Sequence, residues 1–126
     1  MKIVALIILA LLVSPSKAWL QARKPATIAE LVNYMSADRE QMLYAGAKAE
    51  GKLMWYTSLA GGSYKELVKL YETKYPGIQV EPFRAGGAEL TVRLEEEYKA
   101  GRFIADAIET TEGNLMFMRE AGLLHP

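Results

Sequence analysis

The feature that most constrains the fold is a threefold succession of a short apolar strand, a Gly- or hydroxyl-rich loop and an amphipathic helix. The expected strands span residues 52–58, 78–83 and 105–110, and the expected helices span residues 63–75, 88–100 and 114–121. Strands that alternate with helices of this length favour right-handed βαβ units. The sequence therefore predicts an α/β fold, with a three-stranded parallel sheet flanked by helices.

Pro82 indicates the spatial order of the strands. A proline has no N–H to donate to a ladder, so the second strand is expected at an edge of the sheet and the order is 2-1-3. The chain then reverses direction between the second and third strands, which creates a topological switch point between strands one and three. Because parallel sheets of this kind bind ligands outside the carboxyl ends of their strands, the site is expected in the loops there.

Two further helices are expected before the first strand. Thr27 and Glu30 have the spacing of a capping box, which predicts a short helix at residues 28–35. An Ala-rich segment at residues 39–50 predicts a second helix, and Gly51 is expected to close it.

The helix at residues 63–75 begins with Ser63 and Glu66, which also have capping-box spacing. Its apolar stripe is interpreted as core packing rather than as a cofactor site. The stripe consists of Tyr64, Leu67, Val68, Tyr71 and Tyr75.

In the helix at residues 88–100, Leu90, Leu94 and Tyr98 form the apolar stripe, and Arg93 is expected to pair with Glu97 one turn away. The glutamates at residues 95–97 are interpreted as a solvated face rather than as a metal site, because adjacent helical positions diverge around the axis.

Residues 1–18 have the pattern of a cleaved signal peptide. Lys2 precedes an apolar run at residues 3–13, and small residues surround a cleavage position after Ala18. The run is too short for a helix that spans a bilayer, so export is favoured over a membrane anchor, with Trp19 as the mature N-terminus. Residues 19–36 are then expected to form a linker and a short helix.

Composition excludes several classes of function. The chain has no cysteine, which excludes disulfides, a thiol nucleophile and a lipidated cysteine, and which suits a periplasmic protein. Its 15 basic and 15 acidic residues provide no electrostatic footprint for nucleic acid. The only histidine is His125, and no nucleophile–base pair has a motif spacing, so neither enzymatic activity nor a cofactor is expected.

The loop after the first strand contains Thr57, Ser58, Gly61 and Gly62. Hydroxyls and free N–H groups before a helix suit a carboxylate, a phosphate or another oxygen-rich ligand. The alternative is a plain Gly-Gly turn in which Ser63 caps the helix.

The loop after the second strand contains Arg84, Gly86 and Gly87. It lacks the spacing of a dinucleotide or P-loop fingerprint, so the glycines are interpreted as turn residues. Arg84 is a candidate partner for an anionic ligand or for a surface salt bridge.

The loop after the third strand contains Thr110, Thr111 and Glu112. Glu112 is a weak candidate for a metal ligand or for binding an ammonium group. Its alternative role is to complement the dipole of the helix that follows.

An ordered set of segments resembles extracellular solute-binding proteins of bacterial ABC transporters, most closely the iron(III)-transport-type group of the type 2 periplasmic binding fold. The segments lie at residues 37–58, 71–80, 84–87, 105–106 and 120–124. The resemblance implies a monomeric receptor whose two α/β lobes close over a small solute and deliver it to a permease in the inner membrane. Residues 37–126 match only the start of the first lobe, so a partial lobe that binds its solute very weakly is expected.

The resemblance leaves the solute open. Some iron binders of the group have a histidine shortly after strand one, where this sequence has Ser58, and a glutamate after strand three, within a residue of Glu112. Ferric iron is therefore not favoured, and an organic or phosphate-bearing anion fits the hydroxyl and glycine loops equally well. Two other classes remain as alternatives: a small secreted flavodoxin-like α/β enzyme and a stand-alone interaction domain.

Overall fold

The computed structural model describes residues 25–124, so the expected signal peptide, residues 19–24 of the expected linker, and His125 lie outside the described residues. Backbone contacts divide the chain into two compact units, residues 1–36 and 37–126. No helix within residues 25–124 has the length and apolar character needed to cross a bilayer.

In the described part of the first unit, residues 25–36, the structure shows one short helix, α1 (Ile28–Val32). The backbone N–H of Glu30 donates to Thr27 Oγ1 at 3.2 Å, and Glu30 Oε2 accepts from the N–H of Ala26 at 2.7 Å. The predicted capping at Thr27 is therefore confirmed. The predicted helix extended to residue 35 and is too long, because Asn33 already occupies the C-cap and donates its side-chain N–H to the carbonyl of Ala29.

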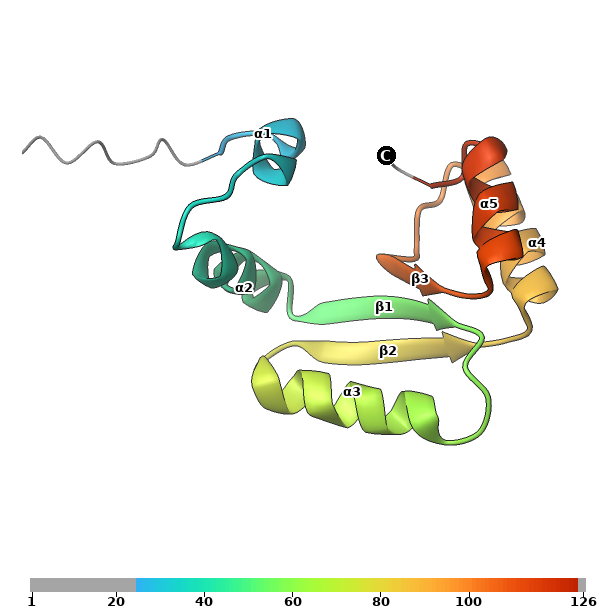
Figure 1. Ribbon diagram of the computed structural model, residues 1–126, viewed down its shortest axis with the longest axis horizontal. Helices are drawn as coiled ribbons and strands as arrows, with labels where there is room; N and C mark the ends of the chain where they lie inside the picture. The colour runs from blue at the N-terminus through green and yellow to red at the C-terminus, as the bar shows by residue number, and fades with distance from the viewer. Residues whose placement is uncertain (1–24, 125–126) are drawn as a thin grey trace, which may run out of the picture. The chain divides into compact units, whose positions relative to one another are not determined.

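The second unit is an α/β structure whose three strands are all parallel, in the order β2-β1-β3 (Figure 1). Its elements follow the predicted alternation. They are α2 (Arg39–Glu50), β1 (Lys52–Thr57), α3 (Ser63–Lys74), β2 (Gln79–Arg84), α4 (Gly87–Lys99), β3 (Ala107–Glu109) and α5 (Glu112–Glu120). The predicted strand order is confirmed, and Pro82 lies in the edge strand β2.

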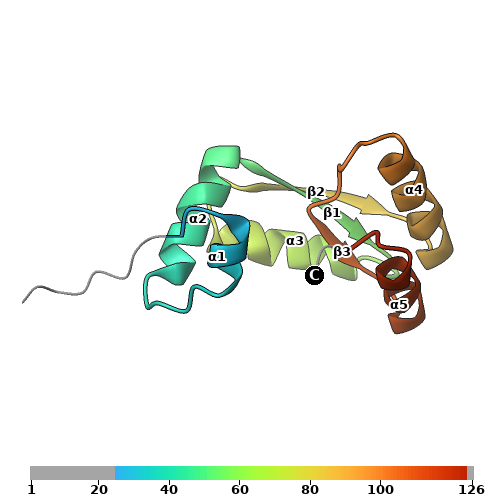
Figure 2. The same ribbon diagram turned by 90° about the horizontal axis from the view of Figure 1, so that it is seen from above.

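The helices cover both faces of the sheet. In Figure 1, α3 lies on one side of β1 and β2, and α4 and α5 lie on the other; Figure 2 shows the same elements from above. The buried core forms between the sheet and the α4–α5 pair. Its buried members are Tyr56, Ala85, Leu90 and Met118.

Strand register aligns the carboxyl ends of the strands. Thr57, the last residue of β1, is level with Arg84 in β2 and with Glu109 in β3. β3 has three residues and is shorter than the predicted strand, although the backbone of Asp106 still contacts β1 by donating to the carbonyl of Met54 at 3.0 Å. Three loops that lie far apart in the sequence therefore begin at the same edge.

Glycines end helices where a left-handed backbone is required. α2 closes at Gly51, whose φ of 77° is a conformation that residues with a Cβ rarely adopt, and the chain enters β1 directly afterwards. The predicted role of Gly51 is confirmed.

The predicted capping box at Ser63 is wrong. Gly62 occupies the N-cap, and Ser63 is already the first residue of α3, so its hydroxyl cannot reach the next N–H groups of the helix. Ser63 Oγ instead donates to the carbonyl of Ala60 at 2.9 Å.

The apolar stripes pack less completely than predicted. On α4, Leu90 is fully buried, whereas Tyr98 is half exposed and packs edge-to-face against Phe103 at 5.7 Å between ring centroids. On α3, Leu67 is 47% exposed and lines a cavity of about 270 Å³ between that helix and the sheet.

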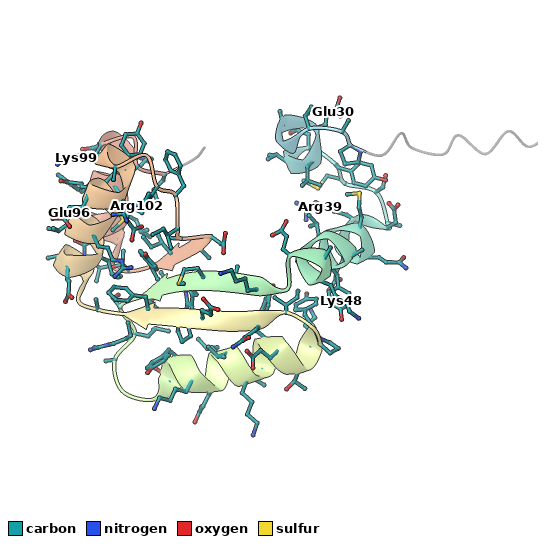
Figure 3. All side chains as sticks on the ribbon, turned by 180° about the vertical axis from the view of Figure 1, so that it is seen from behind. Glu30, Arg39, Lys48, Glu96, Lys99 and Arg102 are labelled. Atoms are coloured by element: carbon teal, nitrogen blue, oxygen red, sulfur yellow. The ribbon has the colours of Figure 1, made fainter. Side chains whose placement is uncertain are left out.

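The prediction of a solvated face at residues 95–97 is wrong for one residue. Glu96 is exposed and projects with Lys99 from the outer side of α4 (Figure 3). Glu97, however, is only 5% exposed, because its position on α4 faces the sheet. Its predicted pairing with Arg93 is confirmed, with 2.8 Å between Arg93 Nε and Glu97 Oε1.

Candidate functional site

The carboxyl ends of β1 and β3 are joined by a contact between side chains. Thr57 is fully buried, and its Oγ1 donates to Glu109 Oε2 at 2.5 Å. The same carboxylate oxygen accepts from the backbone N–H of Ser58 at 3.2 Å. A hydroxyl, a backbone N–H and a carboxylate therefore meet at the switch point that the strand order creates.

The loop after β1 folds back over this contact. The N–H of Leu59 donates to Thr57 Oγ1 at 3.2 Å, and Arg84 Nε donates to the carbonyl of Leu59 at 3.2 Å. Arg84 therefore fixes the loop from the neighbouring strand. Its guanidinium forms no ion pair among the described residues, so the alternative of a surface salt bridge finds no support there.

The glycines of this loop leave space before α3. Gly61 has a φ of 66°, and a Cβ built on Gly61 or Gly62 would meet no described atom within 4 Å. The turn therefore requires a glycine at residue 61 for its backbone, and the N-terminus of α3 is uncrowded.

The loops after β2 and β3 are in close contact with each other. A Cβ on Gly87 would collide with the Asn114 amide and would lie 2.7 Å from Thr110 Oγ1. Asn114 Nδ2 in turn donates to Thr111 Oγ1 at 2.8 Å. Gly87 is therefore needed for close packing of the α4 and α5 N-termini. The sequence predicts only that it allows a tight turn.

Three helix N-termini face the carboxyl edge of the sheet without side-chain caps. Within the described part of the chain, no side chain of the N-cap residues of α3, α4 and α5 accepts a hydrogen bond from the first N–H groups of its helix. These residues are Gly62, Gly86 and Thr111. The first N–H groups of such helices carry partial positive charge and suit oxygen atoms of a ligand.

Glu112 does not take part in the contacts of the site. It is the first residue of α5 and is exposed, a position in which it complements the helix dipole. Over residues 25–124, no three His, Cys, Asp or Glu side chains are grouped so as to hold a metal ion.

The structure adds two residues that the sequence analysis did not select, Glu109 and Asn114. The sequence pattern places Glu109 inside a strand, and its position at the last place of β3 is the signal that identifies it as an edge residue. Asn114 follows Thr111 by three residues. Because α5 begins at Glu112 rather than at residue 114, Asn114 lies in the first turn of the helix and its side chain reaches the Thr111 hydroxyl.

A second polar cluster lies on the opposite face of β1. Tyr56, which precedes Thr57, donates its hydroxyl to Glu97 Oε1 at 2.6 Å and accepts from Arg93 Nε at 2.8 Å. The Arg93 guanidinium stacks over the Phe83 ring, 4.0 Å from its centroid. We call Tyr56, Arg93 and Glu97 the core clamp.

The core clamp perturbs the titration of its members. Burial raises the pKa of Tyr56 above its ordinary value of 10.0, and the hydrogen bond to Glu97 raises it further. The hydrogen bond to Tyr56 raises the pKa of Arg93, which therefore stays charged. The clamp thus balances its buried carboxylate with a permanent cation.

Several cavities lie away from the carboxyl edge, and one of about 580 Å³ lies beside Gly51, Ile78 and Gln79. One of about 400 Å³ is lined by β3, α4 and α5, and one of about 270 Å³ lies between α3 and the sheet. Both have mostly apolar linings, and neither contains any of the predicted site residues. The candidate site is therefore an open edge rather than an enclosed pocket.

Comparison with known proteins adds no family assignment, since neither a scan against protein-family models nor a search of curated proteins finds a match.

Proposed function

We propose that the chain is the exported solute-binding component of an ABC importer, and that residues 37–126 belong to its first lobe. The observation that carries the proposal is the convergence of three uncapped helix N-termini on the carboxyl edge, beside the hydroxyls of Thr57 and Thr110. The resemblance described above supports it, as does the signal-peptide pattern at residues 1–18. The proposed solute is small and anionic, phosphate-bearing or ferric.

In this proposal the edge provides one wall of the site. Helix N–H groups bind the oxygen atoms of the solute, and Arg84 holds the loop after β1 in place. A second lobe provides the opposite wall, and solute contacts to both walls favour the closed state, which the inner-membrane permease then receives. With one wall only, the chain binds its solute more weakly than micromolar.

The contacts at the edge favour binding over catalysis. The hydroxyls of Thr57, Thr110 and Thr111 each contact Glu109 or Asn114, and no histidine lies among the described residues to act as a base. Loss of a turnover on mutating Glu109 or Glu112 would favour the alternative of a small secreted enzyme.

Binding at the edge is tested by nuclear magnetic resonance on the ¹⁵N-labelled chain, titrated with inorganic phosphate and with propionate at millimolar concentrations. The proposal predicts shifts of amide signals at the starts of α3, α4 and α5, with Gly62, Gly87 and Gly113 as reporters. Absence of any shift there contradicts it. Micromolar or tighter binding by calorimetry contradicts the single-wall account.

Export is tested separately by expressing the chain in a Gram-negative bacterium. The proposal predicts a periplasmic product whose N-terminal sequence begins at Trp19. An uncleaved product retained in the cytoplasm contradicts it.

A further inference from the structure

The proposed solute site contains a carboxylate whose charge is not balanced by a basic side chain. Glu109 is half-buried, and no Lys or Arg within residues 25–124 forms an ion pair with it. Arg84, at the level of Thr57 in the neighbouring strand, donates its Nε to Leu59 instead. A carboxylate without a cation nearby repels a purely anionic ligand.

The two oxygens of the Glu109 carboxylate have different surroundings. Oε2 accepts from Thr57 Oγ1 and from the N–H of Ser58, so the orientation of the group is fixed. Oε1 accepts no hydrogen bond from any described residue. The buried side-chain atoms without a partner in that part of the chain are Arg39 Nε and Glu97 Oε2 only, so Glu109 Oε1 is accessible to solvent. The oriented carboxylate therefore presents one free acceptor at the edge between β1 and β3.

We infer that the solute carries an ammonium or similar cationic N–H group, and that Glu109 selects it by accepting a hydrogen bond through Oε1. The inference rests on the proposed function and names the chemical class of its solute. Hydrogen bonds between an ammonium and a carboxylate are about twice as strong as neutral ones. A cationic group also removes the repulsion between Glu109 and the anionic part of the solute.

Glu109 and the start of α5 are neighbours in the chain. Glu109 is two residues before Thr111, the N-cap of α5, and two residues of extended chain span at most about 7 Å. A small zwitterion with its cation at Glu109 therefore lies close in the chain to the uncapped start of α5.

A purely structural role for Glu109 predicts different behaviour. Tying β1 to β3 uses Oε2 alone, and the amide oxygen of a glutamine accepts the same two hydrogen bonds. Glu109→Gln therefore keeps the tie and removes the charge. Glu120→Gln is the matched control. Glu120 is exposed and is the last residue of α5, the helix that follows β3, so it lies away from the carboxyl edge.

The experiment uses the full ¹⁵N-labelled chain and three probes of similar size: β-alanine, propylamine and propionate. We expect β-alanine to bind more tightly than propionate, and propylamine to shift the Ser58 and Glu109 amide signals. Glu109→Gln should weaken β-alanine binding about tenfold, towards the affinity of propionate, and Glu120→Gln should leave it unchanged.

The failure of this inference is distinguishable from failure of the proposed function. Equal affinity of the wild-type chain for propionate and β-alanine overturns the role of Glu109 and leaves the edge site standing, and it requires no variant to fold. Unchanged β-alanine affinity in Glu109→Gln overturns it as well. If none of the three ligands propionate, β-alanine and phosphate shifts the amide signals at the starts of α3, α4 and α5, the proposed function is contradicted too.

Discussion

Two consecutive residues of β1 anchor two glutamates in opposite ways. Tyr56 contacts Glu97 inside the core clamp, where Arg93 supplies a balancing charge. Thr57 contacts Glu109 at the carboxyl edge, where no described Lys or Arg forms an ion pair with the carboxylate. Successive side chains of a strand point to opposite faces, so one strand end serves both environments. A carboxylate that is balanced internally contributes to stability, whereas one left unbalanced at an edge is available to a ligand.

The largest effect is expected from breaking the core clamp at Arg93. Arg93→Met leaves the buried Glu97 without its cation, and the free energy of unfolding should fall by about 2–3 kcal/mol, less than for a fully buried pair because Arg93 is partly exposed. Lys99→Met is the control, since its pair with Glu95 is largely exposed, and it should cost under about 1 kcal/mol. Urea denaturation measures both. Similar losses in the two variants would show that the clamp is no more important than a surface pair.

A smaller loss is expected from removing the hydroxyl of Tyr56. Tyr56→Phe deletes one hydrogen bond to a charged group, and it should cost about 1–2 kcal/mol at neutral pH by chemical denaturation. Glu97 keeps its contact with Arg93 in this variant, so the loss should be below that of Arg93→Met. A loss equal to or larger than that of Arg93→Met would contradict the ranking of charge over hydroxyl.

Tyr56 also predicts a dependence on alkaline pH. Its pKa is raised on folding, so the folded state keeps the proton that the unfolded state releases above pH 10.0. The associated stability is complete below that pH and is lost as pH rises above it. Stability measured from neutral to alkaline pH should fall more steeply in the wild type than in Tyr56→Phe. Parallel curves would contradict the raised pKa.

At the edge, Gly87→Ala should cost about 1–2 kcal/mol, because the new methyl meets the end of the Asn114 side chain and also the hydroxyl of the buried Thr110. Asn114→Ala should recover part of this loss in the double variant, measured by the same denaturation. Additive losses in the double variant would contradict the direct contact.

The smallest stability effect is expected at Glu109. Glu109→Gln keeps both hydrogen bonds of Oε2, so the free energy of unfolding should change by less than about 1 kcal/mol. A larger loss would show that Glu109 stabilises the fold as Glu97 does. It would contradict the difference between the core clamp and the contact of Thr57 with Glu109.

The sequence predicts most of the fold because its signals are local. Strand and helix patterns, the αL glycine at residue 51 and the missing N–H of Pro82 each act within a few residues, and they suffice for the strand order. The positions of Thr57, Ser58 and Thr110 at the carboxyl edge also follow from the sequence. The burial of Glu97 and the contact of Glu109 do not follow from local patterns, because they depend on which face of a helix or strand meets the rest of the fold.

The most direct test of the account is the dissociation constant of β-alanine in Glu109→Gln and Tyr56→Phe, measured on the full chain by amide chemical shifts. The account predicts affinity about tenfold weaker in Glu109→Gln, which keeps its stability, and unchanged affinity in Tyr56→Phe, which loses stability. Equal effects of the two variants on β-alanine binding would contradict the division of the two glutamates between stability and ligand binding.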